Sequence, residues 1–147
     1  MFHKQDARMA RLAEVSLFAA CSKAELRALP RITTELDAAA GTILCTEGTT
    51  GLTCYVVMEG TATVTIDGDD IDAVGRGGFF GEMALLDGGP RVATVTAVTD
   101  MRLLVLSRNE LTRLLTDVPS VSRKMLTAVG ARLRVAHSQL HPGRLGV

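Results

Sequence analysis

Residues 78–95 read GFFGEMALLDGGPRVATV, a stretch that predicts a loop, a short helix, a second loop and a strand. Good helix formers run from Glu82 to Leu86, and the sequence Gly88-Gly89-Pro90 ends the helix after about two turns. A helix this short contributes little packing surface. Its N-terminus, however, offers unpaired backbone N–H groups and the positive end of the helix dipole. The stretch therefore predicts a binding site for an anion.

Charged residues stand at the start of this helix and just beyond its second loop. Arg91 can direct a planar, permanently charged guanidinium at the anion, and Glu82 can accept a hydrogen bond from a sugar hydroxyl. Gly81 allows a tight turn and a close approach of the backbone to a ligand. A ligand that carries an anionic group next to a hydroxyl is, for example, a sugar phosphate. The alternative is that Glu82 and Arg91 pair with each other across the glycine-rich turn.

The segments 80–86 and 90–95 resemble the phosphate-binding cassette of the cyclic-nucleotide-binding domain family, which includes catabolite activator protein and the regulatory subunits of protein kinase A. The resemblance covers residues 12 to 136, approximately. It implies that Glu82 binds the ribose 2′-hydroxyl, that Arg91 binds the cyclic phosphate, and that backbone amides complete the cradle. The cassette residues expected to bind ligand are Gly81, Glu82, Met83, Ala84, Arg91, Val92 and Ala93.

The same resemblance implies a ligand, a 3′,5′-cyclic nucleotide. In the family a hydroxyl residue directly after the arginine favours guanine, whereas Val92 here can neither donate nor accept a hydrogen bond. We therefore expect cyclic AMP to be preferred, with cyclic GMP as the second candidate. Val64, Ile71 and Val74 are expected to form walls around the base and sugar. Met125 or Val129 is expected to form a lid over the base.

The pattern before and after the cassette predicts a mostly β fold with helices at both ends. Helical spacing runs through the first 30 residues, and Ser22 with Glu25 forms a capping box for a helix that Pro30 ends. From Arg31 to Leu106 the period is two, with glycine turns, which indicates an antiparallel barrel or jelly roll (double-stranded β-helix). Strands are expected at residues 32–37, 42–46, 52–58, 61–66, 71–74, 91–98 and 101–106.

Two further helices are expected, over residues 108–116 and 120–140, the first capped by Ser107 and Glu110 and the second started by Pro119. The longer helix has an apolar stripe, which either packs on its own barrel or pairs with a second copy as a homodimer. We expect residues 1–147 to form a single domain. Its parts are a helical lead-in over 1–30, the barrel over 31–106 with the cassette at 78–95, and the C-terminal helices over 107–140. No helix-turn-helix or other output domain is expected, so sequence-specific DNA binding is not.

Composition fits a globular cytoplasmic protein. The 147 residues are 47% hydrophobic and only 3% aromatic, and no apolar run is long enough for a membrane span or signal peptide. Three cysteines without metal-site spacing are read as small core residues in a reducing compartment. Residues 32–117 hold five basic and thirteen acidic side chains, a net charge of −8. Because long-range attraction is screened by salt, anion binding in this segment needs a cation close to the anion, such as Arg91.

No catalytic or metal-binding constellation is found, so an enzyme is not expected. Five basic residues lie beyond residue 117 with no acidic one, which is typical of a solvated helix face and also compatible with contact to nucleic acid. The function expected is a regulatory sensor module that relays cyclic-nucleotide binding through its C-terminal helix. Two alternatives stay open: a degenerate domain that serves as an interaction or dimerisation module, and a transcription regulator that acts through a partner.

Overall fold

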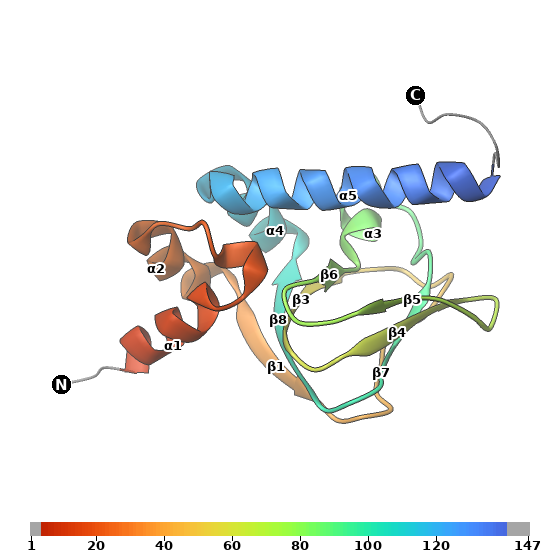
Figure 1. The fold of residues 1–147 in the computed structure, drawn as a ribbon, viewed down its shortest axis with the longest axis horizontal. Coiled ribbons are helices and arrows are strands. Elements are labelled where there is room, and N and C mark those ends of the chain that lie inside the picture. The colour runs from red at the N-terminus through yellow and green to blue at the C-terminus, as the bar shows by residue number, and fades with distance from the viewer. Residues whose placement is uncertain (1–3, 141–147) are drawn as a thin grey trace.

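The computed structural model describes residues 4–140, and they form two four-stranded antiparallel sheets with helices at one end and along one side (Figure 1). The two ends of the predicted 1–147 domain, residues 1–3 and 141–147, lie outside the described residues. The strands are β1 (Thr34–Ala38), β2 (Ile43–Cys45), β3 (Thr53–Glu59), β4 (Ala62–Ile66), β5 (Asp69–Val74), β6 (Phe79–Phe80), β7 (Thr94–Ala97) and β8 (Met101–Ser107).

The helices are α1 (Lys4–Ala13), α2 (Lys23–Ile32), α3 (Glu82–Asp87), α4 (Arg108–Asp117) and α5 (Pro119–Leu140), with a 3-10 turn, η1, at Ser16–Phe18. Both predicted capping boxes form. Pro30 was predicted to end the helix α2, but the helix continues to Ile32. The proline falls in the last turn, where its missing N–H removes one hydrogen bond, and burial of Leu29 and Ile32 keeps that turn helical.

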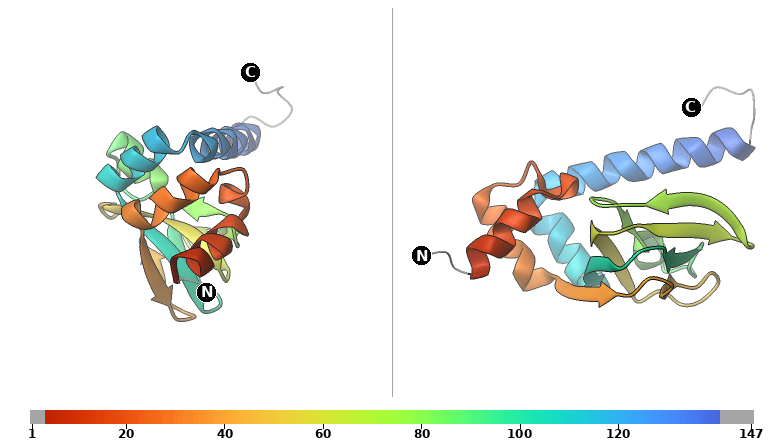
Figure 2. Two further views of the ribbon diagram at one scale, coloured as in Figure 1. Left: turned by 90° about the vertical axis from the view of Figure 1, so that its left-hand side faces the viewer. Right: turned by 60° about the horizontal axis from the view of Figure 1, so that its bottom comes forward.

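One sheet has the strand order β1-β8-β3-β6 and the other β2-β7-β4-β5. The mostly β jelly-roll class with flanking helices is therefore confirmed. The two sheets face each other as a sandwich and do not close into a hydrogen-bonded barrel, which corrects the barrel part of the prediction. Figure 2 shows the open arrangement from two further directions, with α5 running past the sheets.

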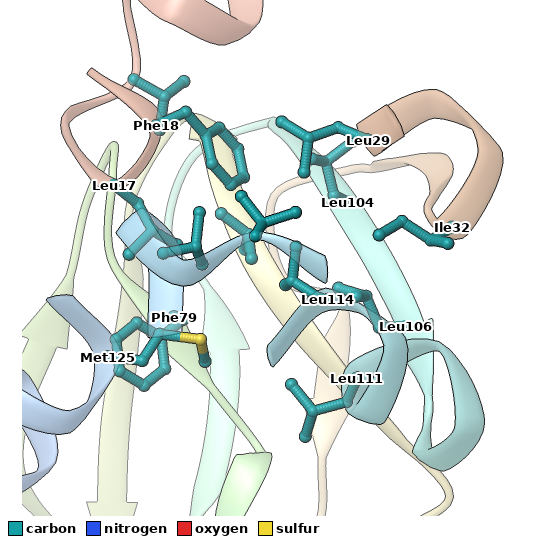
Figure 3. Close-up of a cluster of buried hydrophobic side chains, with 14 of the residues drawn as sticks. Leu17, Phe18, Leu29, Ile32, Phe79, Leu104, Leu106, Leu111, Leu114 and Met125 are labelled. Carbon is teal, nitrogen blue, oxygen red and sulfur yellow. The ribbon is translucent and has the colours of Figure 1, made fainter. Parts of the chain in front are cut away.

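The sheet containing β3 and β8 is covered on both faces, because alternate residues of each strand enter different cores. On the helical side, Val56, Leu104 and Leu106 pack with residues from α2, η1, α4 and the first turns of α5 (Figure 3). On the other side, Val57 and Leu103 pack between the sheets. The cassette therefore sits on a strand layer that is fixed from both sides.

Candidate cyclic-nucleotide site

The short strand β6 places the start of the cassette. Tyr55 of β3 pairs with Phe80, and the two rings stack with their centroids 4.9 Å apart. Gly81 then turns the chain with φ at 84°, a left-handed conformation that favours glycine. The helix α3 begins at the next residue, and no side chain caps its N-terminus. As predicted from the glycines, it is short, and Gly88 ends it with φ at 73°.

Glu82, the first residue of α3, is a buried carboxylate with an exposed fraction of 3%. Its partner is Arg132 of α5, whose Nη1 donates to Glu82 Oε1 over 2.7 Å. The same guanidinium donates through Nη2 to the carbonyl of Phe79 and lies 4.5 Å from the centroid of the Phe79 ring. Three contacts therefore tie the long C-terminal helix to the cassette.

Arg91 is also buried, with an exposed fraction of 7%. Its Nη1 donates to the Gly81 carbonyl over 3.0 Å, and its Nη2 donates to the hydroxyl of Thr53 over 3.4 Å. Its backbone is fixed by two bonds to the preceding turn, Arg91 N–H to the Thr49 carbonyl and Gly48 N–H to the Arg91 carbonyl, each 2.8 Å. Among the described residues no carboxylate pairs with this guanidinium, so the alternative of a Glu82–Arg91 pair is not what the structure shows.

Two glycines leave room for the Arg91 side chain. A Cβ on Gly81 would lie 2.7 Å from Arg91 Nη1, and a Cβ on Gly51 would lie 3.0 Å from both Nε and Cζ of Arg91 and 2.6 Å from the Cβ of Ala84. These separations are shorter than van der Waals contact. The guanidinium therefore occupies a slot that exists because both positions lack a side chain.

The remaining predicted residues divide into buried and exposed sets. Ala84, Ala93 and Val74 are buried, and Val64 is partly buried against the core between the sheets. Met83, Val92 and Ile71 are exposed by 41%, 54% and 53%. Ile71 lies where the β4–β5 register shifts, between Asp70 and Asp72, so the structure does not group it with Val64 and Val74. Met125 is buried in the helical core, and Val129 packs against that core.

Sequence reasoning missed Arg132, Thr53 and Gly51. Arg132 is one of the five basic residues beyond residue 117, and its side chain is still 41% exposed. It also lies three residues after Val129 and four before Ala136, within the apolar stripe of the helix. An arginine inside such a stripe is the signal that could have identified it. Thr53 and Gly51 carried no comparable signal, because their role depends on contacts with residue 91, far along the chain.

The thiols near the site are held in the protonated form. Burial, and secondarily the negative charge of Glu82, raises the pKa of Cys54 to about 12. Burial also raises the pKa of Cys45, against the opposing effect of Arg91. Both cysteines are free and buried, as predicted for small core residues. Within residues 4–140 no group of histidine, cysteine and acidic side chains could hold a metal ion.

Comparison with known proteins identifies the family. Residues 35–117, which include the whole cassette, match the model of the cyclic nucleotide-binding domain. The chain belongs to this family. The membership predicted from residues 80–86 and 90–95 is thus confirmed.

Two curated relatives show how this domain is used elsewhere. A cyclic nucleotide-gated potassium channel of Rhizobium etli is 38% identical over 95 residues, which are 65% of this chain and 26% of the channel. A CRP-like cAMP-activated global transcriptional regulator of Mycobacterium tuberculosis is 26% identical over 134 residues, 88% of this chain and 60% of the regulator. The chain thus spans less than two thirds of the length of either relative. Within its described part, no helix has the length and apolar character needed to cross a membrane.

A solved structure shares both the fold and sequence similarity. The regulatory domain of protein kinase A from Toxoplasma gondii, solved with cAMP, is 30% identical, with a TM-score of 0.62. The alignment covers 78% of this chain and 46% of that chain. That protein therefore holds cAMP in a fold like the one seen here.

Proposed function

We propose that this domain binds a 3′,5′-cyclic nucleotide in the cassette and acts as a regulatory sensor, not as an enzyme, in the cytoplasm. The phosphate would be held by Arg91 and by backbone amides of residues 81–84 and 93, and the ribose 2′-hydroxyl by Glu82. Val64 and Val74, which both pack in the core between the sheets, would line the base and sugar, whereas the exposed Ile71 is left out of this wall. The support comes from the family, from the cAMP-bound relative and from the geometry of the two buried charged groups.

The single observation that carries the proposal is that Arg91 is buried without a carboxylate partner among the described residues. A buried cation is expensive, several kcal/mol even after relaxation, and proteins normally offset this with a carboxylate. Here the described partners are one carbonyl and one hydroxyl. A guanidinium has five N–H donors, of which these bonds use two, so three remain for an anion. The site therefore has an unmet demand for negative charge that a cyclic phosphate would satisfy.

The second part of the proposal is a preference for cyclic AMP. Val92 follows Arg91 directly and cannot exchange hydrogen bonds with a guanine. We expect cyclic AMP to bind more tightly than cyclic GMP, by a modest factor, because the discrimination rests on the absence of one favourable contact. AMP should bind more weakly than either, because its phosphate is not held in a ring with the ribose and loses more conformational freedom on binding.

Calorimetry with cyclic AMP, cyclic GMP and AMP tests this part of the proposal, supported by the thermal stabilisation that a ligand specific for the folded state produces. Arg91→Ala should lose about 1.5–3 kcal/mol of binding free energy, which is tenfold to over a hundredfold in affinity. Arg102→Ala is the matched control, because Arg102 is half-exposed and pairs with Asp37 on the surface. Equal affinity of Arg91→Ala and wild type would refute the phosphate assignment. Absence of binding by wild type would leave the degenerate interaction module as the better reading.

We further propose that α5 relays binding. Arg132 of this helix contacts Glu82 and Phe79, so a ligand that engages Glu82 acts on a group already joined to α5. A ligand can shift the position of the helix only by its preference for one arrangement of these contacts. Amide hydrogen exchange of α5 should change on addition of cyclic AMP in wild type and change less in Arg132→Gln. An identical response in both proteins would exclude Arg132 as the link.

A homodimer through residues 120–140 is proposed as the form in which this relay is used. Leu126 and Leu133 are seven residues apart on α5 and exposed by 71% and 62%, the spacing of a coiled-coil seam. Light scattering of wild type and of Leu126→Glu/Leu133→Glu tests the homodimer, and a monomeric wild type would refute it.

A gel shift with random DNA at low salt tests the alternative of direct regulation of transcription through the basic helix.

A further inference from the structure

We propose that Thr53 is the positioning residue for the phosphate-binding arginine, fixing the plane of the Arg91 guanidinium through its hydroxyl. This role rests on the proposed function and extends it to a residue outside the cassette, on strand β3. A guanidinium on a long side chain rotates about its last bonds unless two of its nitrogens are anchored. Here the Gly81 carbonyl anchors Nη1 and the Thr53 hydroxyl anchors Nη2.

The direction of the Thr53 hydroxyl is set by a chain of hydrogen bonds. Its Oγ1 donates to the Tyr55 hydroxyl over 3.2 Å, and that hydroxyl donates to the Leu44 carbonyl over 3.4 Å. Because a hydroxyl has one proton to donate, the Thr53 oxygen then presents its lone pairs to Arg91. The chain ends on a backbone carbonyl of the other sheet, and stacking on Phe80 holds the Tyr55 ring. Both sheets therefore contribute to the orientation of one guanidinium.

A neutral anchor suits this position better than an acidic one. A carboxylate at the same place would pair with Arg91 and compete with the ligand for its charge. A hydroxyl instead accepts one bond, fixes the plane and leaves the positive charge unneutralised. The slot between Gly51 and Gly81 completes the arrangement. Its walls limit sideways movement of the Arg91 guanidinium, which the hydrogen bond to Thr53 would not prevent by itself.

Thr53→Val and Thr53→Ser test the role, with Thr96→Val as the control, since Thr96 is a half-buried strand threonine on β7, outside this hydrogen-bond chain. Thr53→Val keeps the shape of the side chain and removes the acceptor, so cyclic AMP affinity measured by calorimetry should fall about two- to tenfold. Thr53→Ser retains the hydroxyl and should bind within about twofold of wild type. Tyr55→Phe should weaken binding in the same direction as Thr53→Val, by a smaller factor.

A double-mutant cycle separates positioning from a general loss of structure. In an Arg91→Lys background the side chain keeps its charge but lacks the second nitrogen that Thr53 anchors, so adding Thr53→Val should have little further effect on affinity. Two results would overturn the positioning role of Thr53 without affecting the proposed function. One is an equal loss of cyclic AMP affinity from Thr53→Val in both backgrounds, and the other is a loss in Thr53→Ser as large as in Thr53→Val. If wild type does not bind any cyclic nucleotide, the proposed function fails first and the role of Thr53 in affinity fails with it.

Discussion

Replacing Gly51 by alanine should disrupt the arginine slot from outside the cassette. The added Cβ would lie 2.6 Å from the Ala84 Cβ and 3.0 Å from two atoms of Arg91, so neighbours must shift on both sides. The contact with Ala84 involves a Cβ fixed to a helix backbone and cannot be relieved by rotating a side chain. Overpacking of this kind costs about 1–3 kcal/mol. For a chain of this size the melting temperature would fall by roughly 2–12 °C.

The variant should also lose ligand affinity, because Arg91 is the more movable neighbour and gives way first. Displacing it forfeits part of the charge-assisted bond, so we expect cyclic AMP to bind about tenfold more weakly. Gly75→Ala is the matched control: nothing lies within 4 Å of its added Cβ, and its stability and affinity should stay near those of wild type. Calorimetry and thermal unfolding of the three proteins decide the matter. A Gly51→Ala protein as stable and as tight in binding as Gly75→Ala would refute the slot.

Three more predictions follow from buried or capped groups. Arg91→Met should unfold at a temperature no lower than wild type without ligand, because it removes a buried cation that lacks a carboxylate, yet it should gain no stability from cyclic AMP; marked destabilisation of the ligand-free variant would contradict this. Burial that raises the pKa of Cys54 to about 12 should keep this thiol unreactive toward Ellman's reagent until the protein unfolds, and rapid labelling of the native protein would contradict it. The pKa of Glu25 is lowered mainly by the hydrogen bond from the Ser22 backbone, so its stabilising contribution is present above the unfolded pKa and lost as pH falls through the lower folded value. Melting temperatures of wild type and Glu25→Gln should therefore converge in acid. A difference that does not depend on pH would show that the charge of the Glu25 carboxylate is not the source of the stabilisation.

Local patterns were sufficient for most of the elements and for the short cassette helix. They did not predict the two-residue strand β6, which lies in the expected loop, and they began the strand β7 at residue 91 instead of Thr94. The capping pairs at Ser22 and Ser107 form as expected, because each depends on residues only three positions apart. The short helix after Gly81 was likewise predicted from its own glycines and proline. In these cases the sequence neighbourhood contains the whole physical cause, and neither packing nor distant strands can easily override it.

Contacts between distant residues were beyond such reasoning. Whether the strands close into a barrel depends on pairing between sheets, which a period of two cannot specify, and the structure has a sandwich. Pro30 was expected to end its helix, but burial of Ile32 extends the helix past it. The partner of Glu82 is fifty residues away on α5. Each of these outcomes is set by tertiary packing, which local propensity does not report.

The pairing of Glu82 with Arg132 explains how an acidic stretch can keep an anion site. The segment 32–117 has a net charge of −8. Within it, a buried glutamate such as Glu82 would ordinarily neutralise a buried arginine such as Arg91. Here Arg132 of α5 donates to Oε1 of Glu82, so the negative charge of this carboxylate is already paired and Arg91 is left with neutral partners. Removing Arg132 should then do more than loosen α5. Glu82 would be free to turn toward Arg91, and the site would lose part of its attraction for phosphate as well as its link to the helix.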